Sequence, residues 1–310
     1  MAERDAALRA LVAEELAQPV DPRVMAFAAD IAARHPSARA VLFYGSCLRE
    51  AALDGLMLDF YLIVGEYRAA FRKRWLATVN RLLPPNVFPA EHHGLVAKYA
   101  VLSEADFDRL MSPSTENVSV WARFAQPSRL VWTAGDPARA MTIDAVVKAA
   151  PTLLRAARAC LPDRMPALDL WRRAFALTYA AELRAERNSR AGSVVDADQA
   201  RYRRFTAPAL AAAGLAPRLV GDEVALALLT PAERRVGARA WARRRRSGKA
   251  LTLLRLAKAS ATYAGGLDYL AWKIGRHAGE PVAIRPWQRR WPILGAITLL
   301  PRLMLRGAVR

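Results

Sequence analysis

The chain has 310 residues, of which 54% are hydrophobic and 24% charged, a balance that argues against disorder and is typical of one large or two ordinary globular domains. Its 47 Lys and Arg residues outnumber 28 Asp and Glu residues, and the net charge of +19 predicts a negatively charged partner. Residues 234–310 carry 18 of the basic residues and only two acids, so a net +16 lies in this C-terminal part and only +3 in residues 1–233.

Cysteine content and hydropathy limit where the protein can work. The two cysteines, Cys47 and Cys160, are too few to stabilise a chain of this length by disulfides or to build a metal cluster, which favours a reducing compartment. The N-terminal segment lacks the apolar run of a signal peptide. The longest apolar stretch, 291–305, contains two prolines and falls short of the roughly 18–20 residues of a spanning helix. We therefore expect a cytoplasmic protein that is peripheral on the inner face of the cell membrane.

The first 137 residues alternate between helical and strand patterns, as in an α/β domain. Apolar residues recur at spacings of three and four over 3–17 and 22–34, which predicts two helices. Ser103 followed by two acids predicts the N-terminus of a later helix. Apolar runs rich in β-branched and aromatic residues predict strands. In chain order, the other elements are strands at 40–44 and 56–64, a helix at 67–83, and strands at 94–102 and 130–133.

From about residue 138 the pattern changes to long, Ala-rich helical periodicity with almost no strand signal. Proline and glycine breaks separate the helices. The sequence therefore predicts a mixed-sheet α/β domain over 1–137, an all-helical domain over 138–248, and a basic, amphipathic C-terminal region over 249–310. The expected helices of the second half span 138–160, 166–187, 197–212, 231–246 and 249–276.

The most informative pattern joins the first two predicted strands. The first strand ends in Gly45-Ser46, and twelve residues separate Ser46 from Asp59 in the next strand. A strand, a Gly-Ser turn that opens a helix, and an acid on the neighbouring strand form the arrangement of a nucleotidyltransferase, so we assign this fold to residues 1–137. Gly45 lets the backbone approach a phosphate, and Ser46 with the helix N-terminus donates to a triphosphate. Asp59 would hold Mg²⁺, which prefers carboxylate and phosphate oxygens.

A purely structural explanation competes with this one. Gly45-Ser46 can be a tight turn after a buried strand, with Asp59 paired at a sheet edge. A carboxylate inside an apolar strand is costly to bury unpaired, which favours a functional role. The acid that often follows two residues later is replaced by Tyr61, and Asp54, the nearest other carboxylate, is more typical of a turn.

Several short motifs follow one another in order along the chain. They include Phe-Tyr-Gly-Ser at 43–46, Leu-Asp-Phe at 58–60 and Lys-Tyr-Ala-Val-Leu-Ser at 98–103. Further along lie the segments 120–127, 156–163, 177–184 and 258–274. In this order the chain resembles the mitochondrial-type phosphatidate cytidylyltransferases, the CDP-diacylglycerol synthases that are also described as translocator-maintenance proteins, and we expect a bacterial member of that family.

The resemblance implies a reaction of CTP with phosphatidic acid that gives CDP-diacylglycerol and pyrophosphate and requires Mg²⁺. No strong general base is needed, because a phosphomonoester is already ionised near neutral pH. Asp59 and Lys98 are the implied catalytic residues, with Asp59 as the metal ligand. The candidate nucleotide- and phosphate-binding residues are Tyr44, Gly45, Ser46, Arg123, Glu182 and Arg184.

Each of the later candidates also has a structural explanation. Lys98 can be a solvated lysine at a strand end, and an internal acid can partner Arg123. Glu182 and Arg184 lie two apart on a predicted helix, so they do not face each other and can belong to an ordinary helix surface. The adjacent histidines at 92–93 have no ligands at metal spacing apart from a neighbouring glutamate, which favours a loop pair.

The basic C-terminal region predicts contact with a negatively charged surface. Four arginines occupy 243–246, Trp287 and Trp291 interleave with arginines, and the apolar run 292–305 follows. This mixture suits an anionic membrane surface, where each basic residue contributes about 1 kcal/mol. A nucleotidyltransferase acting on RNA ends, with the tail along phosphates, is the alternative, and a catalytically degenerate membrane-associated scaffold is another. The apolar run favours lipid, so no nucleic-acid partner is expected.

Overall fold

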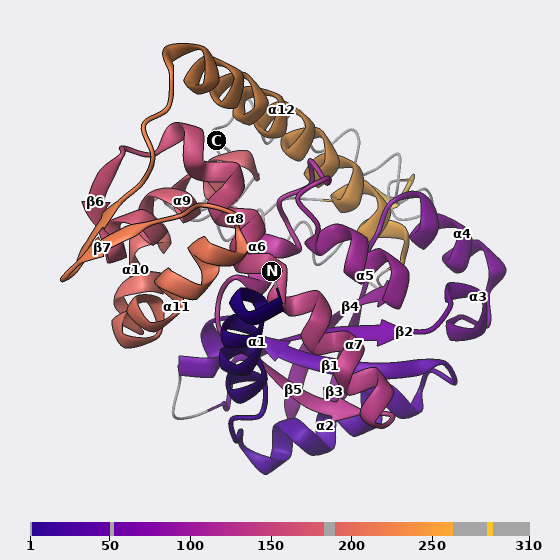
Figure 1. Ribbon diagram of the computed structural model, residues 1–310. Coiled ribbons are helices and arrows are strands. Elements are labelled where there is room, and N and C mark those ends of the chain that lie inside the picture. The colour runs from indigo at the N-terminus through magenta and orange to yellow at the C-terminus, as the bar shows by residue number, and fades with distance from the viewer. Residues whose placement is uncertain (1, 50–52, 183–189, 263–283, 288–310) are drawn as a thin grey trace.

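The computed structural model describes residues 2–49, 53–182, 190–262 and 284–287, and its centre is a five-stranded mixed sheet (Figure 1). Strands β2 and β4 pair in parallel, and the other neighbouring strands pair antiparallel in the order β3-β4-β2-β1-β5. The chain is thus a mixed α/β protein, and all four strands predicted from the sequence are confirmed. The strands are β1 (Ala38–Tyr44), β2 (Met57–Val64), β3 (Asn86–His92), β4 (Leu95–Ser103) and β5 (Ser128–Thr133).

Strand β3 was not predicted. It carries Pro89, which removes a backbone donor and weakens a strand pattern. Its position at the edge of the sheet makes the proline tolerable, because only one side of an edge strand pairs with a neighbour. His93, at φ +47°, and Gly94, at φ +78°, turn the chain from β3 into β4, and the ring of His92 stacks on Phe27.

The helices predicted in the first half are present, with one correction, and the short helix Trp121–Phe124 was not predicted. The helix predicted at 67–83 is two helices, because Phe71 adopts an extended backbone and its ring packs against Phe88. Ser103 caps the fifth helix as predicted, since its hydroxyl accepts from the N–H of Asp106 at 3.2 Å. The helices are α1 (Ala2–Leu16), α2 (Pro22–Ala33), α3 (Tyr67–Ala70), α4 (Arg74–Leu82), α5 (Glu104–Met111) and α6 (Trp121–Phe124).

The second half is mainly helical, as predicted, but it also contains a small sheet in the order β6-β8-β7. Each of its strands has three residues, too few for a periodic signal. They are β6 (Arg164–Pro166), β7 (Arg218–Val220) and β8 (Glu223–Ala225). The helices are α7 (Asp136–Val147), α8 (Ala149–Ala157), α9 (Ala167–Ala181), α10 (Arg190–Asp196), α11 (Gln199–Ala212) and α12 (Pro231–Thr262).

Helix α12 corrects the prediction of two separate helices at 231–246 and 249–276. It is one helix of 32 residues, although a break was predicted at Gly248. Glycine is used there for close packing: a Cβ on Gly248 would lie 2.2 Å from the carbonyl oxygen of Ala181, and one on Gly237 would lie 2.1 Å from the Cβ of Ala159. The helix therefore runs tightly along the helical half and reaches β3 of the large sheet (Figure 1). Residues 263–276 of the predicted helix lie outside the described residues.

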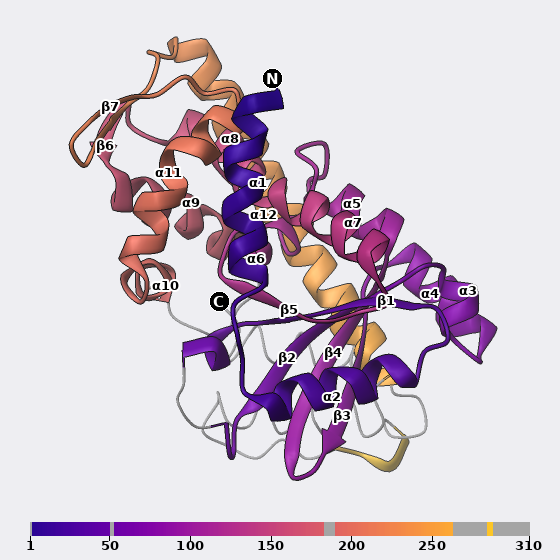
Figure 2. The same ribbon diagram turned by 60° about the horizontal axis from the view of Figure 1, so that its bottom comes forward.

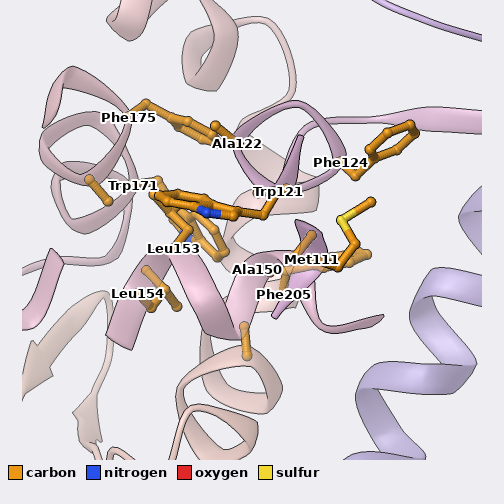
Figure 3. Packing of buried hydrophobic residues seen from close by; sticks show 14 of the residues in the cluster. Met111, Trp121, Ala122, Phe124, Ala150, Leu153, Leu154, Trp171, Phe175 and Phe205 are labelled. Atoms are coloured by element: carbon orange, nitrogen blue, oxygen red, sulfur yellow. The ribbon is translucent and has the colours of Figure 1, made fainter. Parts of the chain in front are cut away.

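Two hydrophobic cores cover the two faces of the large sheet. One face, with Val41 and Phe60, packs against α2, which Figure 2 shows lying across the sheet. The other face contributes Leu42 and Tyr61 to a larger core that continues without interruption into α8, α9 and α11. Figure 3 shows its centre, where Trp121 of α6 lies close to side chains of the later helices. The core thus crosses residue 138, and the domain boundaries at 137 and 248 stay predictions.

A buried histidine, His35, lies among residues of the core on the α2 side of the sheet and makes the stability of the fold depend on pH. His35 Nδ1 lies 3.0 Å from the carbonyl oxygen of Ala70, and Nε2 lies 3.1 Å from the hydroxyl of Tyr99. The carbonyl can only accept, so Nδ1 carries the proton and Nε2 accepts from the tyrosine. This neutral ring is buried, and burial lowers the pKa of His35.

We expect acid to destabilise the protein through His35. A histidine whose pKa is lowered by folding binds its proton more readily in the unfolded chain, so its contribution to stability falls as the pH drops below about 6.5. The Tm advantage of the native protein over His35→Gln should therefore shrink between pH 7.5 and pH 5.0. His93→Asn, an exposed turn position that tolerates positive φ, is the control. A difference in Tm between native protein and His35→Gln that stays constant with pH would contradict this expectation.

Candidate functional site

Residues from separate predicted motifs lie in one row across the sheet. In the strand register Tyr44 of β1 is opposite Asp59 of β2, and Asp59 is opposite Lys98 of β4. Because side chains alternate between the faces of a strand, Tyr61 lies on the same face as Asp59. Tyr61 belongs to the larger core, so this row of side chains is on the sheet face that packs against the helical half.

Asp59 is held between a cation and a glycine. Lys98 Nζ lies 3.2 Å from Asp59 Oδ1, and 20% of the Asp59 side chain is exposed. Gly45 has φ +97°, and a Cβ added there would lie 3.2 Å from Asp59 Oδ2. Glycine is therefore required at this position both by the backbone conformation and by the space beside the carboxylate.

The loop after β1 differs from its prediction. The helix expected to begin at Ser46 is a single 3₁₀ turn over Ser46–Arg49, with residues 50–52 outside the described part of the chain. Leu53 is buried, and Gly55, at φ +75°, already turns the chain toward β2, which leaves little length for a longer helix. Ser46 is exposed, so its hydroxyl is accessible to a ligand. The loop does not, however, supply the N-terminus of a long helix that the sequence predicted.

Arg123 reaches the site from α6. Its Nη1 donates to the carbonyl oxygen of Ser119 at 2.9 Å, and its guanidinium carbon lies 5.7 Å from the centre of the Tyr44 ring. Burial acts to lower the pKa of Arg123, but the neighbouring tyrosine oxygens and the carboxylates of Glu182 and Asp59 raise it well above its ordinary value. The predicted candidates Tyr44, Asp59 and Arg123 therefore share one electrostatic environment.

Of the two candidates at the end of α9, the structure describes Glu182 but not Arg184. Glu182 follows the last residue of α9 and has an extended backbone, so it is not on the helix surface that was predicted. The helix ends at Ala181, where α12 packs closely against it. Glu182 contributes to the pKa of Arg123 and is thus near the site. Arg184 lies outside the described residues.

Sequence reasoning missed Arg255 of α12. Its Nη1 donates to the hydroxyl of Ser119 at 2.9 Å, while Nε and Nη2 donate to the carbonyl oxygen of Pro84 at 2.9 and 2.7 Å. Burial lowers the pKa of Arg255, and the charge of Arg123 lowers it further, while Glu182 acts in the opposite direction. The available signal was a pair of cations spaced three residues apart, at 255 and 258, within an otherwise apolar stretch of helix.

Lys258 is the second cation of that pair, and it holds α12 to the start of β3. Its Nζ donates to the carbonyl oxygens of Leu83 and Pro85, the latter at 2.6 Å. Burial, together with the charge of Arg255, lowers the pKa of Lys258 to about 7. The C-terminal half of α12 is thus part of the surroundings of the site.

The residues present can accommodate a magnesium ion only together with a ligand. Among the described residues, no three His, Cys, Asp or Glu side chains cluster as a metal site. Mg²⁺, however, is commonly bound by one or two carboxylates together with substrate phosphates. Asp59 Oδ1 is buried, and Lys98 Nζ lies 3.2 Å from it without the geometry of a hydrogen bond. Oδ2 lies beside Gly45, where the missing Cβ leaves room next to the carboxylate. This single carboxylate fits a metal that a bound phosphate helps to hold.

The basic C-terminal region is described only in part. Arg235, Arg239 and Lys249 are exposed on α12, whereas Arg243 pairs with Glu116. Trp287 is 42% exposed. Trp291 and the apolar run 292–305 lie outside the described residues. No helix in the described ranges is long and apolar enough to cross a membrane.

No protein-family model matches this sequence, and a search of curated proteins finds no significant match.

Proposed function

We propose that the protein is a Mg²⁺-dependent cytidylyltransferase that transfers CMP from CTP to phosphatidic acid or a close acidic lipid. The observation that carries the proposal is the position of Asp59 between Gly45 and Lys98, with Arg123 across Tyr44. A glycine turn, a strand carboxylate, a lysine on the same sheet face and an arginine that reaches this face from α6 suit the binding of a nucleoside triphosphate. The ordered resemblance along 43–274 supports CTP and phosphatidic acid as the substrates.

The proposed reaction asks the protein mainly to position two anions. An oxygen of the lipid phosphate attacks the α-phosphorus of CTP, a new P–O–P bond forms, and the bond to the β-phosphate breaks to release pyrophosphate. The attacking oxygen is already ionised, so no general base has to remove a proton. Lys98 and Arg123 would offset the charge that gathers around the α-phosphorus, and Gly45 with Ser46 would hold the triphosphate.

Asp59 would be the protein ligand of Mg²⁺. When bound, the metal supplies charge neutralisation at the α-phosphate and the leaving pyrophosphate. Lys98 holds the carboxylate in place through its contact with Oδ1. Asp59 would thus have two roles, as a ligand of Mg²⁺ and as the negative charge that pairs with Lys98.

Pyrophosphate release with matched substrates tests the proposal. Purified protein is incubated with Mg²⁺ and each of the four nucleoside triphosphates, and with either phosphatidic acid vesicles or short RNA. We expect release only with CTP and phosphatidic acid, and none with phosphatidylcholine vesicles as the control. Release with RNA and none with lipid would replace this proposal by an RNA nucleotidyltransferase, and no release with any pair would favour a scaffold.

Deletion of residues 285–310 tests where the proposed enzyme meets its lipid. We expect the shortened protein to float less with vesicles that contain phosphatidic acid, because the deletion removes Trp287 and six arginines. Binding of CTP should change little, since the residues around Asp59 remain. Unchanged flotation would contradict the assignment of membrane contact to this segment.

A further inference from the structure

Two arginines from distant parts of the chain converge on one serine beside the candidate site. Arg123 of α6 donates to the carbonyl oxygen of Ser119, and Arg255 of α12 donates to the hydroxyl of the same residue, both at 2.9 Å. The two guanidinium groups are partly buried. The positive charge of Arg123 contributes to lowering the pKa of Arg255. Like charges are thus brought together where water screens them poorly.

The hydrogen bonds of the fold leave much of this donor capacity unused. An arginine has five N–H groups. Arg255 uses three of them on Pro84 and Ser119, and Arg123 uses one on Ser119. Within the described residues, neither guanidinium lies within ion-pair distance of a carboxylate, although the charges of Glu182 and Asp59 act on Arg123 from further away. Two neighbouring cations with donors to spare and no carboxylate in contact are the features of a site for a polyvalent anion.

The position of the pair links it to the nucleotide site. Tyr61 and Glu182 act to raise the pKa of both Arg123 and Arg255, so both arginines lie near these two side chains. Tyr61 lies two residues after Asp59 on β2 and on the same face of the sheet. The guanidinium of Arg123 also lies 5.7 Å from the centre of the Tyr44 ring, so the pair borders the sheet face that carries the row of Tyr44, Asp59 and Lys98.

We propose that Arg123 and Arg255 together bind the phosphomonoester of the acceptor, while Gly45, Ser46 and Asp59 hold the nucleotide. The inference rests on the proposed function and adds Arg255 as a substrate-binding residue. A phosphomonoester carries close to two negative charges and three acceptor oxygens near neutral pH. Two guanidinium forks can each offer parallel N–H groups to a pair of those oxygens. The helical half of the chain would thereby supply the acceptor side of the site.

Arg255→Gln tests this role with a water-soluble, short-chain phosphatidic acid, so that membrane binding does not enter. We expect KM for the acceptor to rise at least tenfold and KM for CTP to change less than twofold. Inorganic phosphate should compete with the acceptor in the native protein and should inhibit Arg255→Gln much less. Arg255→Lys, which keeps a cation but not the fork, should restore part of the loss, and Arg218→Gln, an exposed arginine of β7, should behave as the native protein.

Two outcomes would overturn the inference. One is an acceptor KM that does not change, and the other is an equal rise in KM for CTP and acceptor. Arg255 also holds α12 to Pro84, so thermal melting is used to check that each variant is folded. If Arg255→Gln does not fold, the acceptor KM of the folded Arg255→Lys variant tests the inference instead. If the native protein releases no pyrophosphate with any acceptor, the proposed function fails by itself. Calorimetric titration with inorganic phosphate then tests the pair, and equal affinity in native protein and Arg255→Gln would refute it.

Discussion

Asp59→Asn should abolish pyrophosphate release, by about 10³-fold or more, while the protein stays folded. The amide keeps the size of the carboxylate but loses the charge that would bind Mg²⁺, and a charge stabilisation of this kind is worth several kcal/mol in the transition state. Folding should change little, because both partners of the Asp59–Lys98 contact are partly exposed and such pairs contribute only about 1 kcal/mol. Activity and thermal melting are measured on the same sample.

Asp54→Asn is the matched control for Asp59→Asn. Asp54 lies in the loop before β2, its side chain is 78% exposed, and it contacts only Arg23 at 3.4 Å among the described residues. It should keep native activity. Retained activity in Asp59→Asn would remove Asp59 from the metal site, and lost activity in Asp54→Asn would move the metal site to the loop.

Gly248→Ala should cause the largest loss of stability of any single change considered. The new Cβ would lie 2.2 Å from the backbone carbonyl oxygen of Ala181, which cannot move away without shifting α9 or α12. Overpacking of this kind typically costs about 1–3 kcal/mol and sometimes more. For a large domain, this corresponds to a fall in Tm of roughly 2–12 °C. Because α12 carries Arg255, activity should fall as well.

Ser247→Ala, one residue earlier on α12, is the control for Gly248→Ala. Ser247 is only half-buried, and its hydroxyl bonds carbonyls of its own helix, so alanine should be neutral or slightly stabilising. Differential scanning calorimetry compares the two. An unchanged Tm in Gly248→Ala would contradict the close packing of α9 and α12.

The sequence predicts most of what is local in this fold. The strands β1, β2, β4 and β5 are apolar runs, and Ser103 is a cap whose partner lies three residues away; both signals are carried by neighbouring residues. Strand β3 escapes prediction because Pro89 looks like a strand breaker until its place at a sheet edge is known. Gly248 looks like a helix break because its reason, the backbone of Ala181, is 67 residues away in the sequence.

In the candidate site, too, the sequence predicts what neighbouring residues determine and misses what depends on distant parts of the chain. Motif spacing connects Gly45, in the turn after β1, with Asp59 on the neighbouring strand β2, and strand pairing adds Lys98. Arg255 is missed because its partners, Ser119 and Pro84, are contributed by loops that no local pattern connects to α12. Long-range packing of the helical half against the sheet decides which cations border the site.

Transfer of label from CTP is the most direct test of the proposed function. The protein is incubated with Mg²⁺, phosphatidic acid vesicles and CTP labelled at the α-phosphate, and the lipids are then extracted into organic solvent. The proposal predicts that label enters the lipid phase in an amount equal to the pyrophosphate released, and that Asp59→Asn transfers none. Label that stays entirely in the aqueous phase while pyrophosphate is released would contradict it.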